Sequence, residues 1–285
     1  MRLDYHVHLE FDSYQSPLRL EKERLLRYIE QAKAAGVDEI GISEHCYRFR
    51  EFRPVFAPML SHPDLPAAVA DFFRHGFVDS LESYVDFLVA AQGEGLPIKI
   101  GLEVDFLPES ADMTGEILAA YPWDYVMGSV HFLGTFPVDT APHVGWPERD
   151  VTATYVEYFD TWKRACTSHL FDTMAHPDLL KIFGARPPST PHALYAEAAE
   201  AARQGGVAVE VSSAGLRKPV GEIYPGKALL TAFRKAGVPI TIGSDAHCAE
   251  DVGRQLNDVR QWANEAGYTT ITRFHNRRAG QVPLT

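Results

Sequence analysis

Short runs of apolar, often β-branched residues alternate along the chain with longer segments in which apolar positions recur at helical spacing. The first repeat shows both patterns, because an apolar run at residues 3–7 is followed by a helical pattern at 18–35 that ends at Gly36. Such alternation is typical of repeated βα units around a mainly parallel sheet. Further strands are predicted at 37–42, 98–104, 125–130, 171–175, 207–211 and 238–242, and further helices at 78–91, 151–170, 191–204, 227–235 and 254–266.

The predicted repeats run through the whole chain without a Pro-, Gly- or Ser-rich linker. A chain of 285 residues has the length of one α/β barrel, so the sequence predicts a single domain over residues 1–285 that forms a closed or nearly closed barrel. Two long connections, 46–76 and 133–149, directly follow predicted strands. We expect both to be loops over the active face, because strand-to-helix connections lie at the carboxyl ends of barrel strands.

Charge and cysteine content exclude several classes of protein. The chain carries 27 Lys and Arg against 38 Asp and Glu, a formal net charge of -11, which argues against a general nucleic-acid binder. Three cysteines are too few for a disulfide framework, and the charged first residues do not form a secretory leader. No apolar run approaches the roughly 20 residues that span a bilayer. We therefore expect a cytoplasmic protein without a membrane segment.

Imidazole and carboxylate groups recur at the predicted strand ends. His6 and His8 are two residues apart on one strand, so their side chains face the same side. Each residue alone is compatible with an ordinary polar position, but together they predict a metal cluster. Nitrogen and oxygen ligands suit zinc, manganese or iron, and the absence of a cysteine pair argues against a thiolate site. The residues at these ends are His6, His8, Glu44, His45, Glu103, His131, His176, Asp245 and His247.

These motifs resemble, in order and over nearly the whole chain, the polymerase and histidinol phosphatase (PHP) family of metal-dependent phosphoesterases. The runs GLEVDF at 101–106, YPWDYVMGSVHFLG at 121–134 and SSAGLRKPVGEIYP at 212–225 are most similar to its histidinol-phosphate phosphatase branch. The resemblance implies a single distorted (β/α)7 barrel with three divalent metal ions at the C-terminal ends of the strands. It also implies hydrolysis of L-histidinol phosphate to L-histidinol and phosphate in histidine biosynthesis.

The resemblance assigns ligands by position in the motifs. It implies that Glu103 bridges the first metal to the second. The first ion would be held by His6, His8, Glu103 and Asp245, the second by Glu103, His131 and His176, and the third by His45 and His247.

Two positions depart from the family pattern. The branch commonly has a further histidine where this chain has Tyr14, and we expect Asp12, two residues earlier, to reach the third metal instead. Glu44 stands in place of the usual aspartate before His45. We expect Glu44 to support a ligand or a water rather than to bind a metal directly.

A cluster of divalent ions suggests how a phosphate monoester would be cleaved. Two metals that share Glu103 can hold a bridging hydroxide for in-line attack, and Asp245, near His247, is expected to shuttle a proton to the leaving alkoxide. Arg217 is the first candidate for a phosphate contact because its guanidinium can bind two oxygens, and Lys181 is the second. The expected partner is therefore a small phosphate ester.

Other functions remain open at this point. Another PHP phosphoesterase could act on a phosphotyrosine protein or a nucleotide, and a metal-storing or regulatory module could keep the ligands without turnover. Amidohydrolase-like barrels also begin with a His-x-His pair, but they normally use a carboxylated lysine or a glutamate on strand four, where this chain has His131.

Overall fold

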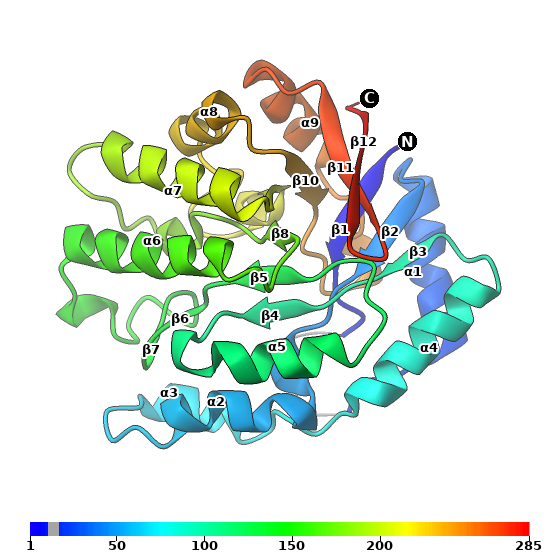
Figure 1. Ribbon diagram of the computed structural model, residues 1–285, viewed down its shortest axis with the longest axis horizontal. Coiled ribbons are helices and arrows are strands. Elements are labelled where there is room, and N and C mark those ends of the chain that lie inside the picture. Colours follow the sequence, from blue (N-terminus) through cyan, green and yellow to red (C-terminus); the bar gives the residue numbers. More distant parts are fainter. Residues whose placement is uncertain (11–16, 285) are drawn as a thin grey trace.

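Strands occupy the centre of the molecule and helices lie around them (Figure 1). The computed structural model describes residues 1–10 and 17–284. None of the helices in these ranges is long and apolar enough to cross a bilayer. The strands are β1 (Leu3–Val7), β2 (Glu39–Ile42), β3 (Ile98–Ile100), β4 (Glu103–Asp105), β5 (Met127–Ser129), β6 (Phe132–Leu133), β7 (Phe136–Pro137), β8 (Thr173–Met174), β9 (Ala208–Ser212), β10 (Ile240–Gly243), β11 (Thr270–His275) and β12 (Arg278–Pro283). The α-helices are α1 (Lys22–Ala34), α2 (Arg53–Leu60), α3 (Ala67–Phe73), α4 (Leu81–Gly93), α5 (Ala111–Ala119), α6 (Val151–Thr167), α7 (His192–Gly205), α8 (Lys227–Ala236) and α9 (Leu256–Glu265).

The central strands form two parallel sheets, which confirms the predicted α/β class. One sheet has the order β1-β2-β3 and the other β10-β9-β8-β5-β4. Isolated hydrogen bonds join the sheets at their edges: the His8 amide donates to the Ala246 carbonyl at 2.7 Å, and the Glu103 amide donates to the Glu44 carbonyl at 3.0 Å. Because neighbouring strands run in the same direction, the residues that follow them meet at one end of the molecule.

The segment 46–76, predicted to be a loop, is instead largely helical. Its proline residues suggested an irregular connection, but Pro54 lies at the first turn of α2, where a missing amide donor has no cost. The helices α2 and α3 both bury aromatic side chains, and the ring centroids of Phe56 and Phe73 are 5.3 Å apart. Tertiary packing of this aromatic face stabilises helices whose short patterns were not recognised in the sequence.

Three further elements were not predicted: the helix α5, the short hairpin β6–β7 and the C-terminal hairpin β11–β12. The tight turn of the C-terminal hairpin is formed by Asn276 and Arg277 instead of the Asn-Gly pair that signals such turns. Both residues take positive φ values, 48° and 58°. Strand β12 is also mostly exposed and lacks an apolar alternation. The hairpin packs against the core through Phe274, which contacts Tyr5 and Tyr125.

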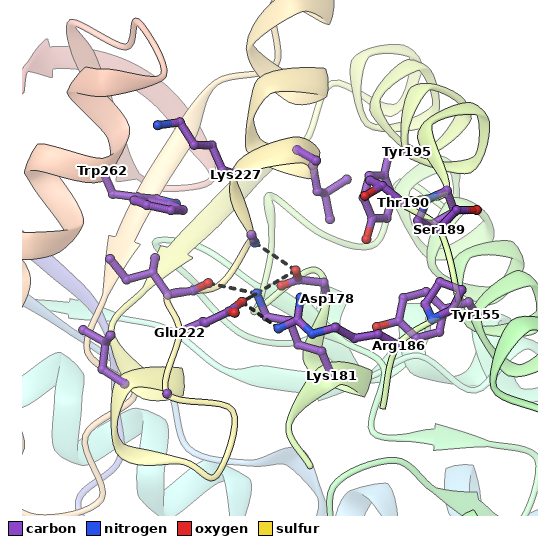
Figure 2. A pocket seen from close by; sticks show the side chains of 18 residues that line it. Tyr155, Asp178, Lys181, Arg186, Ser189, Thr190, Tyr195, Glu222, Lys227 and Trp262 are labelled. Atoms are coloured by element: carbon purple, nitrogen blue, oxygen red, sulfur yellow. Dashed lines mark hydrogen bonds and ion pairs between the residues drawn. The ribbon is translucent and has the colours of Figure 1, made fainter. Parts of the chain in front are cut away.

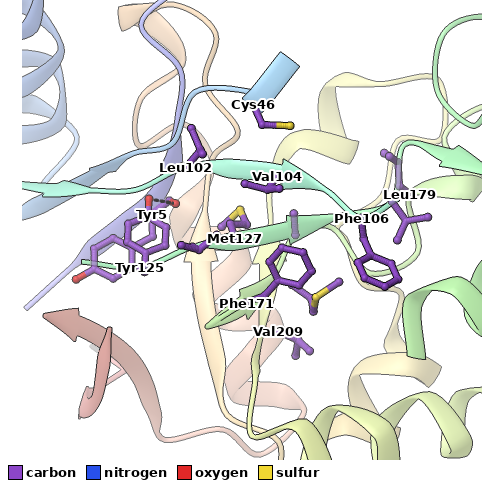
Figure 3. Close-up of a cluster of buried hydrophobic side chains, with 14 of the residues drawn as sticks. Tyr5, Cys46, Leu102, Val104, Phe106, Tyr125, Met127, Phe171, Leu179 and Val209 are labelled. Atoms are coloured by element: carbon purple, nitrogen blue, oxygen red, sulfur yellow. Dashed lines mark hydrogen bonds between the residues drawn. The ribbon is translucent and has the colours of Figure 1, made fainter. Parts of the chain in front are cut away.

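Tyr125 fills the space between the sheets (Figure 3). Its ring stacks on Tyr5 with the centroids 5.2 Å apart, and its hydroxyl donates to the Tyr5 carbonyl at 2.7 Å. Glycines on neighbouring strands make room for this side chain. A Cβ atom at Gly41 would lie 2.2 Å from the Tyr125 hydroxyl oxygen, and one at Gly101 would lie 2.4 Å from its ring carbon Cζ.

We expect Gly101→Ala to lower the free energy of unfolding by about 1–3 kcal/mol, the usual cost of adding a methyl group to a filled core. Gly93→Ala is the matched control, because a Cβ atom there meets nothing within 4 Å. Denaturant titrations of both variants measure the difference. Equal stabilities of the two variants would show that Tyr125 does not require the space at Gly101.

Candidate metal centre

The structure brings together every predicted ligand that it describes, and Glu103 lies at their centre. Its Oε2 atom is 2.8 Å from Nδ1 of His45 and 3.3 Å from Nε2 of His6. Its Oε1 atom is 3.0 Å from Nε2 of His176 and 3.6 Å from Nε2 of His131. Glu103 is 0% exposed, so its charge is shared among imidazoles rather than with water. Each oxygen faces a different set of imidazoles.

Asp245 and His247 complete the cluster from the connection after β10. Asp245 Oδ1 lies 3.5 Å from the Nε2 atoms of both His6 and His8. The His247 ring stacks on His8 with centroids 4.3 Å apart. Asp245 has a φ of 53°, which non-glycine residues seldom adopt. The Ala246 amide, which donates to the His6 carbonyl at 3.2 Å, helps to hold this turn against β1.

The donor set fits divalent metal ions. Nε2 of His6 and Nε2 of His8 are buried and have no hydrogen-bond partner among the described residues. Buried nitrogen and oxygen atoms normally find such partners, and atoms that converge without them are suited to a cation. Four overlapping groups of three residues could each hold an ion, because within each group the ligand atoms lie within 4.8 Å of one another. The groups are His6, His8 and Glu103; His6, His176 and Asp245; His45, Glu103 and His131; and His8, His45 and His247. The division of these residues among individual ions stays a prediction.

Electrostatics keep the two central carboxylates ionised. Burial by itself raises the pKa of Glu103, but His6, His45 and His131 outweigh it and hold this pKa well below its usual range. His6, His8 and His247 likewise outweigh burial and hold the pKa of Asp245 well below its usual value. Both side chains are therefore anionic at neutral pH, as metal ligands must be.

A layer of carboxylates behind the imidazoles was not identified from the sequence. Glu210 Oε1 is 2.9 Å from Nδ1 of His6, and Asp105 Oδ1 is 2.9 Å from Nδ1 of His131. With Glu103, Asp105 outweighs the effect of burial and raises the pKa of His131 to about 9. Two signals pointed to this layer: Asp105 is two residues from Glu103 on one strand, and Glu210 is an acidic residue inside an apolar run.

The prediction for Glu44 is consistent with its position, because its carboxylate lies behind His8. Glu44 Oε2 is 3.9 Å from Nδ1 of His8, and the Leu9 amide donates to the same carboxylate. Glu44 therefore holds the backbone at Leu9, the residue after His8. Asp12 and Tyr14, the positions predicted to bear on the third metal, lie outside the described residues.

The two predicted phosphate-binding cations are engaged in contacts within the protein. Arg217 donates to the carbonyl of Ser244 at 2.6 Å and to that of Asp245 at 3.3 Å. Lys181, 2% exposed, donates to the Ile223 carbonyl at 3.0 Å and pairs with Asp178 at 2.9 Å. It lines a neighbouring cavity of about 460 Å³ (Figure 2). Contact of either residue with phosphate stays a prediction.

Comparison with known proteins agrees with this geometry. The family model described as the PHP domain matches residues 4–214. The chain belongs to the PHP domain family. The match includes every predicted ligand before the connection after β10.

Several relatives of this PHP domain are named histidinol-phosphatases or probable histidinol-phosphatases. It is 36% identical over 204 residues to a probable histidinol-phosphatase of Deinococcus radiodurans, covering 70% of this chain and 78% of that one. It is 26% identical over 272 residues to the histidinol-phosphatase of Bacillus subtilis, covering 88% and 95%. Its fold is similar to the crystal structure of histidinol phosphate phosphatase from Lactococcus lactis, complexed with zinc, L-histidinol and phosphate. That similarity has a TM-score of 0.74, with 22% identity and 98% of both chains covered.

We expect zinc or manganese to raise the melting temperature of chelator-treated protein by about 5–10 °C. An ion at 100 times its dissociation constant stabilises the folded state by about 2.7 kcal/mol, and about 1 kcal/mol shifts the melting temperature of a chain of this size by roughly 2–4 °C. Differential scanning calorimetry measures the shift.

The matched variants for this measurement are His6→Gln and His62→Gln. His6→Gln removes a central donor and should lose most of the shift, whereas His62 is half-exposed outside the cluster and its variant should keep it. A melting temperature that zinc, manganese and iron all leave unchanged would contradict the metal assignment.

Proposed function

We propose that this PHP domain hydrolyses L-histidinol phosphate to L-histidinol and phosphate. The observation that carries the proposal is the bridging geometry of Glu103 among imidazoles from separate strands. The histidinol-phosphatases among its relatives, up to 36% identical, support the substrate. The similar fold from Lactococcus lactis, complexed with L-histidinol and phosphate, supports a small-molecule phosphate ester as the partner.

We infer that three divalent ions, zinc, manganese or iron, complete the site. The zinc of the Lactococcus lactis structure supports this kind of cofactor. When bound, such ions would neutralise phosphoryl oxygens and lower the pKa of a water molecule. The residues that would hold them are His6, His8, Asp12, His45, Glu103, His131, His176, Asp245 and His247.

The proton path runs through Asp245 in this proposal. Because its pKa is held low, Asp245 begins the reaction ionised and cannot protonate the leaving group directly. It can accept the proton that the attacking water loses and then deliver it to the alkoxide of L-histidinol. His247, whose Nδ1 is 3.6 Å from Asp245 Oδ1, orients this carboxylate. Glu103 stays ionised throughout and keeps the cluster assembled.

We infer that the segments 46–76 and 133–149 cover the active face and contact the substrate. Two ring contacts support this placement. Tyr47, at the start of the first segment, stacks on His45 with centroids 4.6 Å apart. Phe73 of α3 lies 5.6 Å from Phe132, the residue after His131. The first segment therefore contacts the proposed ligand His45 and the residue next to His131.

We also infer that the two sheets close into a single distorted (β/α)7 barrel, one domain over residues 1–285. The bridge between Val7 and Ala246 joins β1 to the end of β10, and the bridge between His45 and Glu103 joins the end of β2 to β4. Both bridges are parallel, like the ladders within the sheets. These two bridges support the proposed closure.

A cytoplasmic location is part of the same proposal. The three cysteines, Cys46, Cys166 and Cys248, are all free, as expected of a protein from a reducing compartment. The net charge of -11 supports a partner other than nucleic acid.

We expect purified enzyme to release phosphate from L-histidinol phosphate with a kcat/KM at least about 100-fold above that for 4-nitrophenyl phosphate, phosphotyrosine peptide or AMP. Such a ratio corresponds to about 2.7 kcal/mol of selective transition-state binding. A phosphate-release assay over this panel, with and without chelator, measures it.

Chelation should abolish the activity and added zinc, manganese or iron should restore it. Equal kcat/KM values across the panel would reject the substrate assignment but keep a general phosphoesterase. Preference for phosphotyrosine peptide or nucleotide would instead favour another activity of the family. Metal binding without hydrolysis of any ester would indicate a storage or regulatory module.

We expect Asp245→Asn to lower kcat on L-histidinol phosphate by about 100-fold more than on 4-nitrophenyl phosphate, because general acid catalysis matters for an alkoxide and hardly for nitrophenolate. Glu103→Gln should reduce both rates alike, since Glu103 does not carry the proton to the leaving group. Steady-state kinetics on the two esters measure the ratio. Equal losses in Asp245→Asn would limit Asp245 to metal binding.

A further inference from the structure

Glu210 on β9 joins two proposed metal ligands from different elements. Its Oε1 atom lies 2.9 Å from Nδ1 of His6, which is on β1. Its Oε2 atom accepts the backbone amide of His176, after β8, at 2.8 Å. Glu210 and both histidines are almost completely buried. One carboxylate therefore links the imidazole of a ligand on β1 to the backbone of a ligand that follows β8.

The bond to His6 selects which nitrogen of that ring can bind a metal. An ionised carboxylate only accepts hydrogen bonds, so Nδ1 of His6 must carry the ring proton. Nε2 is then left with its lone pair, and this atom faces Oε2 of Glu103 at 3.3 Å and Oδ1 of Asp245 at 3.5 Å. Carboxylates behind metal-ligating histidines commonly set the tautomer in this way.

The bond to His176 restrains an unusual backbone. His176 has a φ of 21°, outside the regions that side chains normally allow. Its amide donates to Oε2 of Glu210, and its Nε2 atom lies 3.0 Å from Oε1 of Glu103. An acceptor on Glu210 is therefore needed at the backbone as well as at the ring of His6.

Gly243 on β10 makes the space that Glu210 occupies. A Cβ atom at this position would lie 2.0 Å from Oε1 of Glu210 and 2.6 Å from Cβ of His6. Neither neighbour can withdraw easily, because both are fully buried. A side chain at position 243 would therefore displace the carboxylate and the histidine together.

We propose that Glu210, seated in the space at Gly243, is the positioning residue that holds His6 and His176 in their metal-binding arrangement. The inference rests on the proposed ligation by these two histidines and is independent of which phosphate ester is the substrate. Both groups that face Glu210 are donors, and a glutamine offers only one acceptor. Glu210→Gln therefore either reverses the His6 tautomer or leaves the His176 amide without its acceptor, although the side chain keeps its shape.

The test compares the metal content of the full-length protein and its variants. We expect Glu210→Gln and Gly243→Ala each to weaken zinc binding by about 10–100-fold in equilibrium dialysis against zinc, followed by elemental analysis. Long-range ¹H–¹⁵N spectra of the zinc-loaded protein, labelled at histidine, report the tautomer. The His6 resonances, identified by their loss in His6→Gln, should show Nδ1–H in the wild type and a changed pattern in Glu210→Gln.

Two control variants separate this effect from general destabilisation. Glu39→Gln alters another buried carboxylate, which lies outside the cluster and pairs with Arg273 at 2.6 Å. This variant should lower stability but keep the zinc content and affinity. Gly93→Ala adds a methyl group where nothing lies within 4 Å and should change neither. A Glu210→Gln protein that unfolds leaves Gly243→Ala, with Glu210 intact, as the second measurement.

The outcomes distinguish this inference from the proposed function. Wild-type affinity and an unchanged His6 tautomer in Glu210→Gln, or wild-type affinity in Gly243→Ala, would overturn the positioning role while metal binding by the wild type stands. Absence of zinc binding by the wild-type protein would instead overturn the proposed metal ligation, and the positioning role with it. Loss of zinc from Glu39→Gln to the same extent as from Glu210→Gln would assign the effect to instability.

Discussion

A carboxylate at 0% exposure, Glu103, is the group on which the arrangement of the site depends. Burying an ionised carboxylate is costly unless opposing charge or hydrogen bonds replace its hydration. Here the replacement comes from imidazoles on or after four different strands, each within 3.6 Å of one of its oxygens. Such convergence requires parallel strands whose carboxyl ends meet, and the two sheets supply them.

The imidazoles are in turn held by carboxylates further from the centre. Glu210 contacts His6, Asp105 contacts His131 and Glu44 lies near His8. The connection after β10 is held separately: the buried carboxylate of Asp4 accepts the amide of Ser244 at 2.8 Å. The cluster is thus the inner part of a network in which carboxylates lie behind three of the imidazoles. Preorganisation of this kind keeps the donors in place before any ligand arrives.

The charge of the whole chain and that of the site have different consequences. A formal charge of -11 opposes an anionic substrate at long range, but salt screens exposed charges beyond about 8 Å. Within the site, divalent ions would offset Glu103 and Asp245 and attract a phosphate group. The engagement of Arg217 with the carbonyls of Ser244 and Asp245 also suggests that this cation first stabilises the loop that carries Asp245.

Patterns in the sequence determined the α/β class and placed imidazoles and carboxylates at the strand ends, because period-two and helical spacing are local properties and His6-Val7-His8 places two imidazoles on one face. The C-terminal hairpin and the helices within 46–76 have weak local patterns, and only packing on the rest of the molecule decides them. Glu210 shows the same limit. Its partners His6 and His176 come from distant parts of the chain, and the space at Gly243 exists only when β9 and β10 pair. The residue types were visible in the sequence, whereas their contacts arise from the tertiary structure, since those contacts join residues far apart in the chain.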